Sequence, residues 1–112
     1  MNNYCAVYEL NPEKIEEYIE VHDNCWQEQL WALRESGAEN LEIFLNGTQC
    51  IITYACESFD LFIEKLSRNE TNKKWQKKMD DFFVSNVNYT GKDKIEPVRK
   101  IFSLKEKLKE QS

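Results

Sequence analysis

The chain has 112 residues, 41% of them hydrophobic and 31% charged, which is the size of one domain and the composition of a globular protein rather than of a disordered or membrane-embedded one. Its 3 glycines form neither of the two common glycine-rich nucleotide-binding motifs. The net charge of −5 divides into −10 over residues 1–66 and +5 over residues 67–112. Acidic residues are interspersed among the lysines of the basic half, and the net negative charge of the whole protein repels phosphate. We therefore expect no nucleic-acid partner.

The first predicted elements are a strand and a long helical segment. Side chains alternate in character over residues 3–10, which predicts a largely buried strand. Asn11-Pro12 combines a helix N-cap with a proline at the first helical position, and helical spacing of apolar residues continues over residues 12–36. Asp23-Asn24 interrupts this segment, so we expect one bent helix or two abutting helices before Gly37. The predicted inward stripe consists of Ile15, Tyr18, Ile19, His22, Trp26, Leu30 and Leu33.

A β-hairpin is predicted next. Residues 41–45 and 50–56 have the apolar and β-branched composition of strands, and Asn46-Gly47 is a strong hairpin-turn pair between them.

Two helices, a strand and a tail complete the chain. Ser58 is the expected N-cap of a helix that ends near Leu66, with Leu61, Phe62 and Leu66 facing inward. A further helix is predicted over residues 71–85, with Trp75, Met79, Phe82 and Phe83 on its inner face. A fourth strand is predicted over residues 95–102, followed by a charged, mobile or weakly helical tail over residues 105–112.

This order predicts an α+β protein with the ferredoxin-like β-α-β-β-α-β arrangement, in which a four-stranded antiparallel sheet carries helices on one face. Residues 1–104 would form one domain, and residues 105–112 would lie outside it. Cys5 and Val7, together with Ile52 and Tyr54, indicate that the second face of the sheet is also apolar. In so small a protein, such a face is covered by a second copy or by a ligand, so we expect a homodimer.

The four cysteines Cys5, Cys25, Cys50 and Cys56 form no C-x-x-C pair, and with a single histidine they complete none of the familiar zinc patterns. We therefore expect no metal and four small, buried, unpaired thiols. The N-terminal residues lack the basic and apolar regions of a signal peptide, and no run is long enough to span a membrane. These features predict a cytoplasmic protein without a membrane partner.

Tyr18, His22 and Trp26 are spaced at i, i+4 and i+8, so they lie along one stripe of the predicted helix. The simplest interpretation is that His22 and Tyr18 sit half-exposed at a sheet edge and have no chemical role. The competing interpretation is a sugar pocket, because flat aromatic rings pack on the C–H faces of sugars while sparse polar groups orient the hydroxyls. His22 has the ordinary pKa near ~6.5 that suits proton transfer at neutral pH.

Residues at several positions along the chain resemble the L-rhamnose mutarotase family, and the resemblance runs from about residue 3 to residue 104. The positions that carry it are Asn11-Pro12, Glu17-Tyr18, His22, Trp26, Gly37-Ala38, Asn40, Trp75 and Met79. The resemblance implies a dimeric α/β-barrel fold and a cofactor-free aldose 1-epimerase that interconverts the α and β anomers of a 6-deoxy sugar. It implies that His22 transfers protons as general acid and base, that Tyr18 and Trp26 contribute to the substrate site, and that Trp75 lines the pocket.

Two positions depart from the family pattern. Gln76 stands where the second tryptophan of a pocket pair is expected, and Leu41 stands where a substrate-contacting tyrosine is common. Because a site that pairs with a hydroxyl discriminates strongly against sugars that misplace it, L-fucose competes with L-rhamnose as the predicted substrate. The sequence is also compatible with a non-catalytic binding domain and with a small cofactor-free oxygenase of the same fold type.

Overall fold

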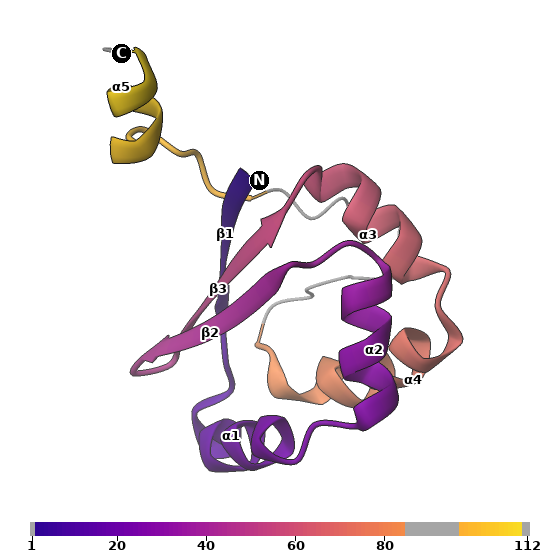
Figure 1. The fold of residues 1–112 in the computed structure, drawn as a ribbon. Coiled ribbons are helices and arrows are strands. Elements are labelled where there is room, and N and C mark those ends of the chain that lie inside the picture. Colours follow the sequence, from indigo (N-terminus) through magenta and orange to yellow (C-terminus); the bar gives the residue numbers. More distant parts are fainter. Residues whose placement is uncertain (1, 85–96, 111–112) are drawn as a thin grey trace.

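The computed structural model describes residues 2–84 and 97–110 as an α+β fold in which helices α1 to α4 lie on one side of an antiparallel sheet (Figure 1). In chain order the elements are β1 (Asn2–Glu9), η1 (Pro12–Lys14), α1 (Ile15–Asp23), α2 (Gln27–Glu35), β2 (Asn40–Asn46), β3 (Gln49–Cys56), α3 (Phe59–Ser67), α4 (Glu70–Met79), η2 (Asp80–Phe82) and α5 (Leu104–Glu110), where η marks a 3-10 helix.

Three antiparallel strands form the sheet in the order β1-β3-β2. Asn46 pairs with Gln49, so the two-residue turn of the hairpin is Gly47-Thr48, one position later than the predicted Asn46-Gly47. Gly47 has φ of +62°, and this positive φ at the first turn position suits the right-handed twist of the two strands.

The predicted fourth strand is not confirmed. Residues 95 and 96 lie outside the described residues, and residues 97–103 form no strand. The Val98 N–H donates to the Cys5 carbonyl over 2.7 Å, so this segment touches the free edge of β1. One such bond does not make a ladder, which needs a repeating pattern of backbone pairs. The described part of the sheet therefore has three strands.

The two faces of the sheet differ in what they contact. Ala6, Ile52 and Tyr54 are buried against the helices. Strand pairing aligns Val7, Ile51 and Phe44 in a row on the opposite face, where Val7 is 39% and Phe44 is 52% exposed. The prediction of a second apolar face therefore holds for Cys5 and Val7, but its assignment of Ile52 and Tyr54 to that face is wrong, because Ile52 pairs with Ala6.

The predicted helical segment consists of two helices, α1 and α2, separated by residues 24–26. Asn11 accepts a hydrogen bond from the Glu13 N–H, as expected of an N-cap. Trp26, which precedes α2, has an extended ψ of 134°. This extended residue breaks the helical phase, so the predicted continuation of the stripe to Leu30 is wrong. Leu30 is 48% exposed and its neighbour Gln29 is 1% exposed.

Helices α3 and α4 each begin at a side-chain cap. The Ser58 hydroxyl accepts from the Leu61 N–H, and the side-chain carbonyl oxygen of Asn69 accepts from the Asn72 N–H. Phe59 is buried and Leu61 is 55% exposed, so the predicted inward position of Leu61 is wrong. The predicted helix over residues 71–85 ends at Met79 and tightens into η2, which still buries Phe82.

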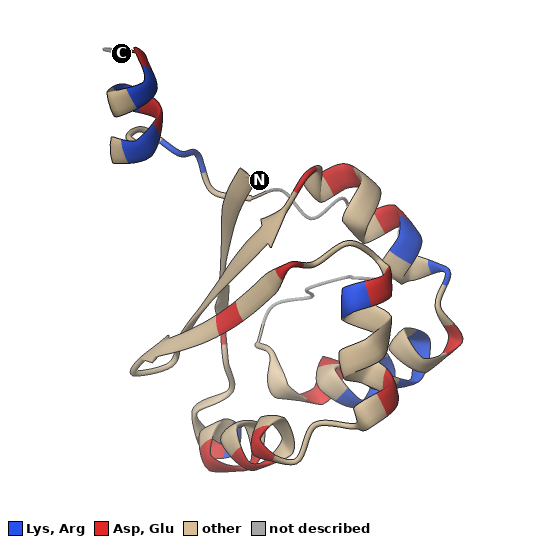
Figure 2. Cartoon of the chain, in the orientation of Figure 1, with Lys and Arg blue, Asp and Glu red and all other residues tan. Residues whose placement is uncertain are grey.

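The C-terminal segment ends in helix α5, which has no buried residue and stands away from the other helices (Figure 1). Figure 2 marks acidic residues along α1 and basic residues along α4 and α5. Each of these charged faces points to solvent, in agreement with the interpretation of the basic half as solvated helix surface.

Candidate functional site

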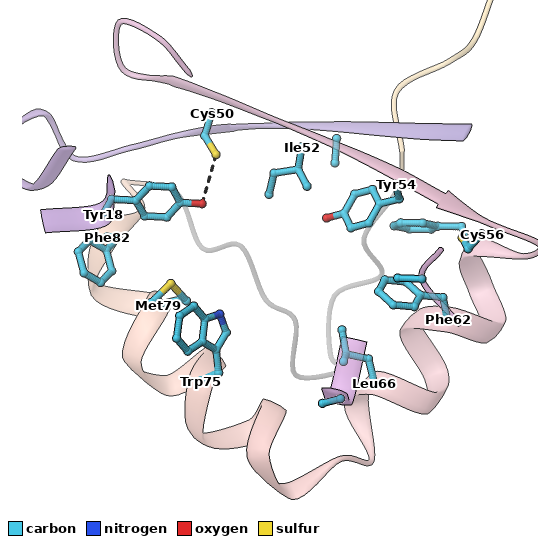
Figure 3. Close-up of a cluster of buried hydrophobic side chains, with 14 of the residues drawn as sticks. Tyr18, Cys50, Ile52, Tyr54, Cys56, Phe62, Leu66, Trp75, Met79 and Phe82 are labelled. Atoms are coloured by element: carbon cyan, nitrogen blue, oxygen red, sulfur yellow. Dashed lines mark hydrogen bonds between the residues drawn. The ribbon is translucent and has the colours of Figure 1, made fainter. Parts of the chain in front are cut away.

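A cavity lies between the sheet and the helices and opens to solvent, and the centres of water-sized molecules can occupy about 80 Å³ of it. Figure 3 shows Tyr18 from α1, Tyr54 from β3 and Trp75 and Met79 from α4 pointing toward this space. The walls are mainly apolar, and the polar side chains among them are few, as is typical of small-molecule sites.

His22 lines the cavity and is held by a backbone carbonyl. Its Nδ1 lies 2.8 Å from the carbonyl oxygen of Tyr18, one helical turn earlier. A carbonyl oxygen only accepts, so Nδ1 carries the proton of the neutral ring. This tautomer leaves the lone pair on Nε2, where it can act as a base.

The pKa of His22 is lowered from its ordinary value of 6.5, chiefly because burial disfavours the charged imidazolium. The hydrogen bond to the Tyr18 carbonyl and the nearby Asp23 carboxylate oppose this shift in part. His22 is therefore neutral at pH 7 and ready to accept a proton.

Tyr18 is 3% exposed and its ring lies 4.3 Å from that of His22, centroid to centroid. Its hydroxyl lies 3.4 Å from the Sγ of the buried Cys50 (Figure 3). Burial, with the neighbouring Cys50, raises the pKa of Tyr18 well above its usual range. The phenol consequently stays protonated and suits hydrogen bonding rather than acid–base exchange.

Trp75 forms an aromatic wall of the cavity. It is 6% exposed and its ring meets His22 edge-on at 5.5 Å between centroids. Trp26 packs edge-on against Trp75, with 5.1 Å between the ring centroids, and the Lys78 ammonium lies over the Trp26 ring, 5.5 Å from its centroid. Trp26 is not among the residues that line the cavity, so it reaches the site only through its contact with Trp75.

Three buried amides meet at the α2–α4 contact. The Nε2 of Gln29 donates to the Oδ1 of Asn72 over 2.9 Å, and the Nε2 of Gln76 donates to the same oxygen over 3.3 Å. Asn72 in turn donates from Nδ2 to the Leu66 carbonyl over 3.0 Å. Gln29 and Gln76 both line the cavity.

The structure thus brings together Tyr18, His22, Leu41, Trp75 and Gln76 around one cavity and places Trp26 beside it. Sequence reasoning missed two residues of this region, Gln29 and Asn72. Both sit in helices at positions that are 1% and 2% exposed, where a polar residue is unusual. A sequence signal was available for Asn72 alone: its i, i+4 spacing from Gln76, which places these two residues on one face of a helix.

The cysteines are all free. Cys50 and Cys56 are buried, while Cys5 and Cys25 are half-buried, so the expectation of four buried thiols is wrong for two of them. No group of three or more His, Cys, Asp or Glu side chains that could hold a metal ion occurs in residues 2–84 and 97–110. None of the helices in that part of the chain is both long and apolar enough to cross a membrane.

Comparison with known proteins shows where this arrangement belongs. The model of the family "L-rhamnose mutarotase" matches residues 3–104, which is most of the chain. The chain belongs to the L-rhamnose mutarotase family. Two L-rhamnose mutarotases of Listeria monocytogenes, from serovar 1/2a and serotype 4b, are each 33% identical to it over 89 residues, covering 79% of this chain and 86% of theirs.

A solved structure supports the fold. The crystal structure of an L-rhamnose mutarotase from Formosa agariphila superposes with a TM-score of 0.72 at 22% identity, covering 93% of this chain and 99% of that one. At that identity the similarity concerns the fold alone. The family membership confirms the resemblance stated from the sequence and the prediction of an isomerase acting on carbohydrates.

Proposed function

We propose that this chain catalyses the interconversion of the α and β anomers of a 6-deoxy sugar, with L-rhamnose as the first candidate and His22 as general acid and base. The observation that carries the proposal is the state of His22. A neutral imidazole, held through Nδ1 with its lone pair on Nε2, lies at the wall of an aromatic cavity. The names of the Listeria relatives support L-rhamnose as the sugar.

In the proposed mechanism, His22 takes the proton from the anomeric hydroxyl of the bound sugar. The electrons of that O–H bond form the C1 carbonyl while the bond from C1 to the ring oxygen breaks, and the imidazolium returns the proton to the ring oxygen. Rotation about the C1–C2 bond then presents the opposite face of the aldehyde, and the reverse steps close the ring as the other anomer. No atom is gained or lost in the cycle.

The remaining site residues have supporting roles in this proposal. Tyr18 orients a sugar hydroxyl, because its raised pKa keeps the phenol protonated and leaves the imidazolium as the stronger acid. Trp75 packs on the C–H face of the ring, and Trp26 fixes the position of Trp75.

The identity of the sugar depends on Leu41 and Gln76. Both line the cavity, Leu41 with an aliphatic side chain and Gln76 with an amide. L-Rhamnose and L-fucose differ in configuration at C2 and C4, so they present different hydroxyls to these two residues. L-Fucose is therefore the second sugar to be compared directly with L-rhamnose.

The test is anomeric exchange, measured by saturation-transfer NMR on L-rhamnose and L-fucose with the wild type and the His22→Ala variant. We expect the wild type to accelerate exchange of at least one sugar and the variant to lose about 10²- to 10⁴-fold of that acceleration. His22→Asn is the matched control for structure, because its side-chain amide can still donate to the Tyr18 carbonyl but cannot act as a base.

Two results would contradict the proposal separately. Exchange no faster than in buffer for both sugars would rule out the mutarotase function. Exchange by His22→Ala as fast as by the wild type would leave the function in place and remove His22 from the mechanism.

We further propose that two copies associate through the open face of the sheet. The row of Val7, Ile51 and Phe44 is a partly exposed apolar surface on the side away from the helices, and a single copy leaves it in contact with water. Analytical ultracentrifugation should give the mass of a dimer, and Phe44→Glu should give a monomer. Glu42→Lys, on the same strand and face, is the charge-substitution control, and a wild type of monomeric mass would refute the dimer.

A cytoplasmic location is proposed with the same function. Four unpaired cysteines in so short a chain are typical of a reducing compartment.

A further inference from the structure

Two buried carbonyl oxygens at the cavity wall have no hydrogen-bond partner within residues 2–84 and 97–110. They are the Oε1 atoms of Gln29 and Gln76, whose residues are 1% and 8% exposed. A buried polar atom without a partner is costly to folding, so such atoms are rare unless a ligand or bound water completes them. Both residues line the cavity that contains His22.

The orientation of both amides follows from a single backbone carbonyl. The Leu66 carbonyl can only accept, so the Asn72 atom 3.0 Å from it is the amide nitrogen, Nδ2. Asn72 must then present its oxygen, Oδ1, on the other side of its amide. Gln29 and Gln76 both approach that oxygen and must both turn their nitrogens to it, at 2.9 Å and 3.3 Å.

The consequence is that both glutamines present oxygen, not nitrogen, at their remaining amide position. The two side chains converge on one atom of Asn72, so each free oxygen lies one amide group away from that atom, in a residue that lines the cavity. The cavity wall at these oxygens accepts hydrogen bonds and offers none from these atoms. It favours neutral ligands that carry hydroxyl donors and disfavours carboxylates and phosphates, which also only accept.

We propose that Gln29 and Gln76 determine sugar specificity by accepting hydrogen bonds from two hydroxyls of the bound sugar, and that Asn72 is the positioning residue that turns both amides. The proposal rests on the proposed sugar function and adds that one part of the cavity wall accepts hydrogen bonds from the sugar. Gln76 replaces the tryptophan expected from the family pattern, so this acceptor pair is a property of this chain rather than of the aromatic pocket that the resemblance implies.

The test pairs a variant with a substrate that lacks one hydroxyl. Gln29→Met and Gln76→Met keep the length of the side chain and remove its amide, and Gln27→Met, on the exposed start of the same helix α2, is the matched control. Each protein is assayed for kcat and KM with L-rhamnose, L-fucose and the 2-, 3- and 4-deoxy derivatives of the preferred sugar. Binding of the same sugars is measured by calorimetry, and thermal unfolding confirms that each variant is folded.

We expect each glutamine variant to lose about tenfold in kcat/KM on the preferred sugar, mainly through KM, the factor that corresponds to one buried hydrogen bond. The wild type should lose a similar factor when the hydroxyl facing that glutamine is absent. The two losses should not multiply. Gln76→Met should have the same kcat/KM for one deoxy sugar as for the parent sugar, and Gln29→Met should have the same kcat/KM for a different deoxy sugar as for the parent sugar. A merely structural role would lower all substrates by the same factor.

The outcomes separate this inference from the proposed function. If the loss from the variant and the loss from the missing hydroxyl multiply for every deoxy sugar, the two oxygens bind only water and the inference is overturned. The mutarotase function would then still stand. Sugar binding that shows the non-multiplying pattern without any anomeric exchange would overturn the function and support the inference. If none of the sugars binds to the wild type, both the proposed function and this inference are overturned.

Discussion

At the scale of single residues, the chemistry of the site depends on where the one histidine of the chain is placed. A helix carries His22 one turn after Tyr18, so its Nδ1 reaches the Tyr18 carbonyl without any partner from elsewhere in the chain. Tertiary packing then buries the ring and lowers its pKa. The local spacing selects the tautomer, and the packing selects the charge.

This placement predicts the pH dependence of the proposed reaction. As the pH falls, protonation of His22 removes the base, and because burial lowers its pKa, kcat/KM should fall to half at a pH below 6.5. The contribution of the same group to stability should be present above that range and lost as the pH falls through the lowered pKa. The pH profile of anomeric exchange from pH 4.5 to 8 provides the measurement.

NMR titration provides the control, since His22 is the single histidine and its ring protons can be assigned without mutation. A titration midpoint at or above 6.5 would contradict the burial argument. A midpoint below 6.5 that differs from the midpoint of the kinetic profile would instead assign the kinetic profile to another group.

At the scale of elements, the helix starts were the most predictable features and the helix phases were the least. Asn11 and Ser58 cap their helices as expected, because a cap depends on a few consecutive residues. Leu30 and Leu61 were predicted to face inward and are exposed. A one-residue change of phase at a helix start rotates every later side chain by about 100° about the helix axis. For α2, which carries Leu30, the sequence around Trp26 does not reveal that change.

The cap of α4 can be tested directly, because this helix carries Trp75 and Gln76 into the site. Asn69→Ala removes the acceptor for the Asn72 N–H and should lower the free energy of unfolding by about 1 kcal/mol in urea titrations. Asn69→Asp keeps a side-chain acceptor and should be close to the wild type. Equal stability of the Ala variant and the wild type would show that packing alone holds the start of α4.

At the scale of the whole molecule, the core and the site occupy the same layer. The helices and the sheet bury Phe62, Leu66 and Met79 together, and these residues also line the cavity. Packing that stabilises the fold therefore also shapes the site. The open face of the sheet and helix α5 take no part in this core.

Removal of residues 105–112 tests this division of the molecule. The described part of α5 buries no side chain, so truncation should leave the free energy of unfolding within about 0.5 kcal/mol of the wild type. Urea unfolding of the full and truncated chains is the measurement, with anomeric exchange as a second readout. A loss of more than about 1 kcal/mol would place the tail within the folded domain.

The sequence by itself determined the class of the fold, most element positions, the helix caps and the presence of Tyr18, His22 and Trp75 on inward helix positions. These features arise from short-range spacing, and the chain carries that information locally. The tertiary structure decided which side of the sheet Ile52 and Tyr54 occupy, where the ladder stops beside Val98, and that Trp26 packs on Trp75 without lining the cavity. It also decided that Gln29, 43 residues before Asn72, shares a hydrogen-bonded oxygen with Gln76. Pairings of that kind depend on how elements dock, and docking is set by the combined packing of all of them rather than by any local pattern.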